Sequence, residues 1–114
     1  MKHITFGDKS LFVGDEAATT LLEYAARLAD AGRADTVDLN TIGPDGHSVT
    51  ATFLLDPGAA LMAESADDSA FEEPDNSAAV AAMQTAMAAL RPTPIASMDA
   101  DEIAELARTF NEDL

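Results

Sequence analysis

The fold is decided by residues 36–55, TVDLNTIGPDGHSVTATFLL. Apolar and polar residues alternate on both sides of the central Gly-Pro-Asp-Gly at 43–46, and this period of two is typical of half-buried strands. Pro44 stands at the second turn position and Gly46 at the fourth, as a type I turn prefers. The stretch therefore predicts an antiparallel hairpin with strands at 36–42 and 48–55.

Towards the N-terminus, residues 15–31 have the pattern of an amphipathic helix. Apolar residues recur at the spacing of one helical face, acids stand in the first turn, and Gly32 follows the last turn. Two short β-rich runs precede the helix, at 3–6 and 11–13, and a Gly-Asp-Lys-Ser break separates them. We expect these runs to form a second hairpin.

On the C-terminal side, Asp56-Pro57-Gly58 predicts a turn and residues 60–64 a third strand, which would complete a meander. Residues 64–75 hold six acids and no base, so we expect an exposed loop, with Phe71 pinning it to the body. The Ala-rich segment 76–90 predicts a helix that Asp75 caps.

The remaining chain divides into a linker and a tail. Residues 91–98 contain two prolines and predict a linker between a single α+β domain at 1–90 and a C-terminal helix or tail at 99–114. Ile103, Leu106 and Phe110 lie on one face of that helix, which is too short to be firmly helical unless the stripe is buried.

The predicted element order is β-β-α-β-β-β-α, followed by the tail helix. The N-terminal hairpin, the crossing helix and the three-stranded meander can join into a two-layer sandwich with one five-stranded antiparallel sheet. Joining the first strand to the last gives the spatial order 2-1-5-4-3. This order resembles the profilin-like and PAS-like groups of folds, which imply sensing, signalling or scaffolding but no particular chemistry.

Charge excludes several classes of partner. The 114 residues carry 21 acids against 6 bases, a formal net charge of −15. Such a surface repels nucleic-acid phosphates and anionic membranes, so we expect neither as a partner. No signal peptide and no membrane-spanning run is recognisable, which predicts a cytoplasmic protein. The acidity itself fits a solubilising surface, a docking face for a basic protein, or a mimic of nucleic acid.

No catalytic, cofactor-binding or metal-binding constellation is recognisable. The chain has no cysteine, no Gly-rich phosphate loop and no nucleophile elbow. His3 and His47 are expected to be separate surface residues, and Tyr24 to close the core with its hydroxyl in water. An EF-hand pattern is absent, so the acids at 64–75 are expected to be solvated.

These observations favour a non-enzymatic protein-interaction domain that forms a homodimer. Its candidate surface consists of Ile103, Leu106 and Phe110 in the tail, and Asp67, Asp68, Glu72 and Glu73 in the acidic loop. One alternative is an acidic inhibitor of a basic protein, of the immunity type or as a nucleic-acid mimic. Another is a small-molecule binder or enzyme with a pocket between helix and sheet, near His47 or Tyr24.

Overall fold

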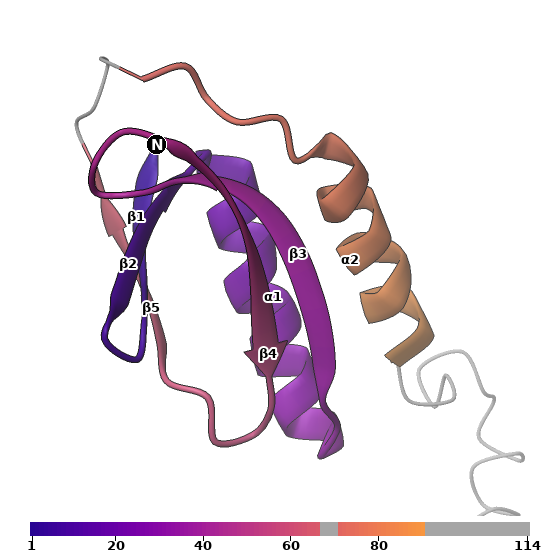
Figure 1. Ribbon diagram of the computed structural model, residues 1–114. Helices are drawn as coiled ribbons and strands as arrows, with labels where there is room; N and C mark the ends of the chain where they lie inside the picture. The colour runs from indigo at the N-terminus through magenta and orange to yellow at the C-terminus, as the bar shows by residue number, and fades with distance from the viewer. Residues whose placement is uncertain (67–70, 91–114) are drawn as a thin grey trace, which may run out of the picture.

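The computed structural model describes residues 1–66 and 71–90, which form an α+β fold with one antiparallel sheet (Figure 1). Its strands are β1 (Lys2–Phe6), β2 (Lys9–Val13), β3 (Asp35–Ile42), β4 (Ser48–Leu55) and β5 (Leu61–Ser65). Its helices are α1 (Asp15–Ala31) and α2 (Ser77–Leu90). The fold class is the one that the sequence predicts. The proposed linker at 91–98 and tail helix at 99–114 lie outside the described residues.

The central hairpin is confirmed, with eight residue pairs in register from Asp35↔Leu55 to Ile42↔Ser48. Its turn is closed by the Gly46 N–H, which donates to the Gly43 carbonyl at 3.0 Å. Gly46 has a φ of +85°, a conformation that glycine adopts without strain. The first hairpin is tighter than expected, because Phe6 pairs with Lys9 across a two-residue turn.

The sheet has the order β4-β3-β2-β1-β5. The neighbours β2–β1, β1–β5 and β4–β3 are those expected from the sequence. The fourth pair of neighbours differs. In the structure β2 lies beside β3, whereas the expected order 2-1-5-4-3 places β5 beside β4. A five-residue connection after β4 carries the chain to the free edge of β1, where β5 pairs along its full length. There Leu61 faces Phe6 and Ala63 faces Ile4, so the apolar side of β5 joins the core.

The sheet is strongly coiled. Phe6 on β1 and Phe53 on β4 are three strands apart, which would be about 14 Å in a flat sheet, yet their ring centroids lie 5.8 Å apart. Only one residue pair, Phe12↔Ile42, joins β2 to β3. The sheet therefore consists of two leaves, β5-β1-β2 and β3-β4, which meet at this pair and curve around α1 (Figure 1).

Helix α1 has the predicted bounds and ends as predicted. The Gly32 N–H bonds to the Ala29 carbonyl and the Arg33 N–H to the Leu28 carbonyl, which is a Schellman motif with Gly32 in the left-handed conformation. The buried face of α1 meets the concave side of the sheet. The largest fully buried side chains are Ile4, Val13, Leu21, Leu39, Thr41 and Leu55.

Helix α2 packs on α1 and along β3 through Val80, Met83 and Met87, all buried. In Figure 1 it runs beside β3 on the outer side of α1. Within the described ranges, neither helix is long and apolar enough to cross a membrane.

Candidate functional site

The predicted interaction residues are only partly placed. Ile103, Leu106 and Phe110, together with Asp67 and Asp68, lie outside the described residues. Two further residues, Glu72 and Glu73, are exposed in the segment that leads from β5 to α2.

Phe71 does pin this segment to the body. Its ring centroid lies 6.2 Å from that of Phe12, and its edge lies against Gly46 of the hairpin turn. Beneath it, Ile42 is 95% buried yet stands apart from the main core. A small second cluster of apolar residues therefore fixes the segment on the convex face of the sheet.

The two histidines flank this second cluster. The His3 ring lies on Phe12, with centroids 4.8 Å apart. His47 lies beside Gly46, and its exposed ring contacts the Asp45 carboxylate at 2.9 Å. The hydrogen bonds from the His47 side chain and backbone hold the pKa of Asp45 below its ordinary value. His47 is a surface residue, as the sequence predicts, and the partners of the two rings, Phe12 for His3 and Asp45 for His47, are seen only in the structure.

The start of α2 is fastened to β3 by the Asn76 side chain, a feature that the sequence does not reveal. Asn76 Oδ1 accepts from the Asn40 N–H at 2.7 Å, and Asn76 Nδ2 donates to the Asn40 carbonyl at 2.8 Å. Asn40 Nδ2 also donates to the Asp75 carbonyl at 2.9 Å. We call these three bonds the asparagine clamp. The Asn76 amide pairs with β3 as a strand would, two residues from Ile42, where β2 makes its single pair with β3.

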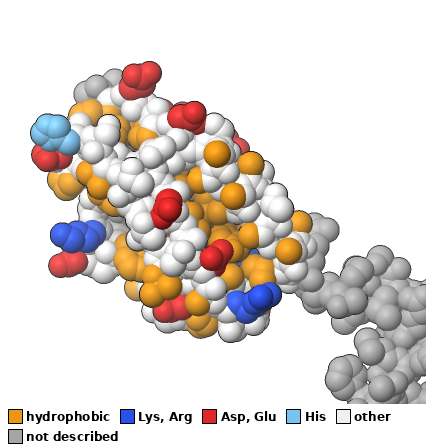
Figure 2. Space-filling view, turned by 45° about the vertical axis from the view of Figure 1, so that its right-hand side comes forward, with side chains coloured by type: hydrophobic (Ala, Val, Ile, Leu, Met, Phe, Trp, Pro, Cys, Tyr) orange, Lys and Arg blue, Asp and Glu red, His pale blue; other side chains and the backbone are white. Residues whose placement is uncertain are grey.

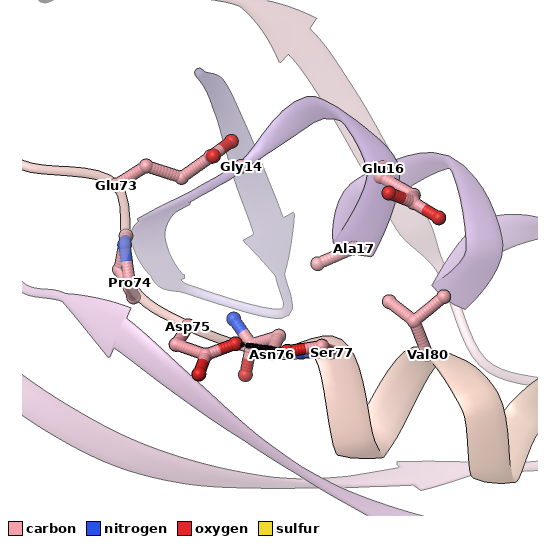
Figure 3. A pocket seen from close by; sticks show the side chains of 9 residues that line it. All are labelled: Gly14, Glu16, Ala17, Glu73, Pro74, Asp75, Asn76, Ser77 and Val80. Atoms are coloured by element: carbon pink, nitrogen blue, oxygen red, sulfur yellow. Dashed lines mark hydrogen bonds between the residues drawn. The ribbon is translucent and has the colours of Figure 1, made fainter.

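A groove of about 310 Å³ lies where both helices begin (Figure 3). Figure 3 shows the Glu73 side chain extended towards Gly14, where a Cβ atom would collide with it. Asp75 accepts from the Ser77 hydroxyl and N–H, which lowers the pKa of Asp75. Carboxylates therefore sit at the electropositive starts of both helices and stabilise them.

The same groove has no evident ligand chemistry. Its acids serve the helix starts, and no group of three or more metal-ligating side chains occurs in the part of the chain that the structure describes. Asp75 accepts from the N–H of Ser77 at the helix start, in line with its predicted capping role. The helix begins at Ser77, one residue later than predicted, and the side chain of Asn76, which directly precedes it, is engaged with β3.

A second groove, of about 180 Å³, lies between α2 and the outer edge of β3. Tyr24 of α1 closes one part of it and is 97% buried. Its hydroxyl donates to Asp35 Oδ2, so the expectation that this hydroxyl reaches water is wrong. Burial, and then the Asp35 carboxylate, raise the pKa of Tyr24 to about 12.

The outer face of α2 carries no charge. The exposed side chains of α2 are Ser77, Ala78, Ala81, Ala82, Gln84, Thr85, Ala88 and Ala89, of which Ala82 lies at the border with the groove. Figure 2 shows small hydrophobic side chains gathered on the side of the molecule where α2 lies, with isolated acids around them. In a chain of which 24% is charged, an uncharged water-facing helix surface is a departure from the rest of the molecule.

The chain matches no family model, no curated protein and no solved structure.

Proposed function

We propose that this domain is a non-enzymatic interaction module that self-associates through the outer face of α2. The observation that carries the proposal is the uncharged surface of that helix in a chain of net charge −15. Two such chains repel each other, and the repulsion is smallest where charges are absent from the contact. Alanine side chains also let two helix backbones approach closely, towards the short end of the usual 8–10 Å interaxial range.

The stripe of small residues has the length and continuity that a helix pair needs. Ala78, Ala81, Thr85 and Ala88 recur at helical spacing along the exposed side of α2. A twofold axis would place this stripe against its own copy, as in most homodimers. The proposed tail stripe, Ile103, Leu106 and Phe110, would extend the same contact if it reaches the partner.

The test is sedimentation equilibrium of the full chain and two variants of equal charge. Ala81→Glu places a carboxylate in the middle of the α2 stripe, whereas Ala26→Glu places one on the exposed side of α1. We expect Ala81→Glu to weaken the dimer by about tenfold or more, since burying an unpaired charge costs over 1.4 kcal/mol. Ala26→Glu should leave it unchanged. Equal effects of both variants, or a parent chain that stays monomeric, would contradict self-association through α2.

Salt separates this function from the second candidate, an acidic inhibitor of a basic protein, which the net charge of −15 favours. Added salt screens the repulsion between two acidic chains and should strengthen a homodimer. The same salt should weaken a complex with a basic nuclease or DNA-binding protein. Binding to such a protein that is tight at low salt and lost at high salt would support the inhibitor.

A further inference from the structure

The groove between α2 and β3 combines an apolar channel with oxygen acceptors at one side. Its walls are the side chains of Val37, Ala79, Ala82, Met83 and Ala86. Asp35, Thr36 and Asp38 of β3 form its other side. Because alanines face the strand, α2 covers β3 without filling the space between them.

The backbone of β3 is turned towards this groove. The asparagine clamp shows that the N–H and C=O groups of Asn40 point away from β4. Since these groups alternate along an antiparallel strand, those of Thr36 and Asp38 point the same way. The Thr36 N–H is engaged by Asp35 Oδ1 at 2.8 Å. Among the described residues β2 pairs with β3 only at Ile42, so the Asp38 carbonyl, which faces away from β4, has no strand partner and is an open acceptor.

The Asp35 carboxylate adds a negative charge with spare acceptor capacity. It accepts one hydrogen bond on each oxygen, from the Tyr24 hydroxyl and the Thr36 N–H. A carboxylate has about four lone-pair positions, so it can take further donors. The nearby positive charge of Arg33 lowers the pKa of Tyr24, but by less than burial and Asp35 raise it.

We propose that this groove takes the side chain of an arginine from a basic protein partner. The methylene stem would lie along the alanines and Met83, and the guanidinium would meet the Asp35 carboxylate and the open carbonyl of Asp38. An arginine fits better than a lysine because its planar fork donates to several acceptors at once. The net charge of −15 attracts such a partner from a distance. This site is separate from the outer stripe of α2 and does not depend on self-association.

The probe is the blocked tripeptide acetyl-Gly-Arg-Gly-amide, added to the full chain. Tyr24 is the only tyrosine and the chain has no tryptophan, so intrinsic fluorescence reports on one side of the groove alone. We expect a saturable change in Tyr24 emission. In NMR spectra, the chemical shifts of the backbone amides should change most around Asp38 and Ala82. The same tripeptide with neutral citrulline in place of arginine should bind at least about tenfold more weakly, because a charged hydrogen bond is lost.

The matched variants are Ala82→Leu, which fills the groove, and Ala81→Leu, which adds the same side chain on the outer stripe. Ala82→Leu should abolish the response to the tripeptide, whereas Ala81→Leu should preserve it. A response that survives Ala82→Leu, or that citrulline matches, would overturn the site. A third variant, Arg91→Gln, tests the arginine that follows α2 in the sequence. If Arg91→Gln changes the emission of Tyr24 before any tripeptide is added, and also tightens tripeptide binding, the groove is occupied by Arg91 of the same chain and not by a partner.

Discussion

The two helices cover the same concave side of the sheet, yet their outer faces differ. Helix α1 exposes Glu16, Glu23, Arg27 and Asp30 to water, and Arg27 lies 3.6 Å from Glu23 one turn away. Helix α2 exposes only alanine, serine, threonine and glutamine. Burial of one face is enough to hold either helix on the sheet. The outer face is therefore free to vary, and on α2 it is the uncharged surface through which we propose that two copies associate.

The helices also differ in how they are attached. Helix α1 is joined to a strand at each end and buries Leu21 completely. Helix α2 depends on three buried apolar side chains and on the asparagine clamp. Loss of an α1 contact should therefore affect the whole domain, and loss of an α2 contact should affect α2 first.

The largest expected effect is on α1. Leu21→Ala should lower the free energy of unfolding by about 3–5 kcal/mol, because a fully buried leucine leaves a cavity. Leu22→Ala, at the half-buried neighbour, should cost clearly less. Urea denaturation measures both. Equal losses in the free energy of unfolding would mean that Leu21 contributes no more to the core than Leu22 does.

The next effect is on the clamp. Asn76→Ala removes two hydrogen bonds and leaves the Asn40 backbone unpaired, so it should cost about 2–3 kcal/mol. Asn40→Ala is the comparison and should cost clearly less, because among the described residues it removes just the exposed third bond of the clamp, to the Asp75 carbonyl, and a long contact with Thr50. Amide exchange should show α2 losing protection while α1 keeps it. A uniform loss would mean that α2 and α1 unfold together.

A smaller effect concerns pH. The pKa of Tyr24 is raised to about 12, above the ordinary value of 10.0. The unfolded chain therefore loses this proton first as pH rises. The associated stability is complete below pH 10 and falls between pH 10 and about 12.

Ultraviolet titration of Tyr24 checks this prediction directly. Because burial is the main cause of the shift, Asn76→Ala should bring the pKa of Tyr24 closer to 10.0 if α2 moves away. Asp35→Asn should lower it as well, through loss of the carboxylate. An unchanged pKa in both variants would exclude α2 and Asp35 as its causes.

The smallest effect should come from the tail. A chain that ends at Leu90 should unfold at the same urea concentration as the full chain, because α1, α2 and the strands β1 to β5 all lie within residues 1–90. Leu106→Asp with Phe110→Ser should likewise spare the domain and weaken only the proposed dimer. A clear loss of stability in either chain would place the tail in the core and overturn the division at residues 91–98.

Local pattern predicts most of the fold. Alternation over 36–55, the Gly-Pro-Asp-Gly turn and Gly32 after α1 each depend on neighbours in the sequence, and each is confirmed. The junction of β2 with β3 was not predictable in this way. It depends on one residue pair and on the reach of the connection after β4, neither of which leaves a periodic signal.

The candidate sites are less predictable than the fold. Tyr24 stands among apolar residues of α1, but its hydrogen bond to Asp35 depends on where β3 begins. Asn76 is one of many polar residues before α2, and only the structure shows that its amide faces Asn40, 36 positions earlier. Helix spacing does identify the buried residues of α2, and the residues between them are the uncharged stripe.

The single pair between β2 and β3 bears on the order in which the chain assembles. Each leaf contains a hairpin closed by a short turn, and contacts between near neighbours cost little loop entropy and form early. The strand β5 must find β1, the first strand of the chain, so this pairing should come late. The asparagine clamp should come last, when α2 settles on β3. Loop entropy thus favours an order of assembly in which the two hairpins form first and α2 attaches to β3 last.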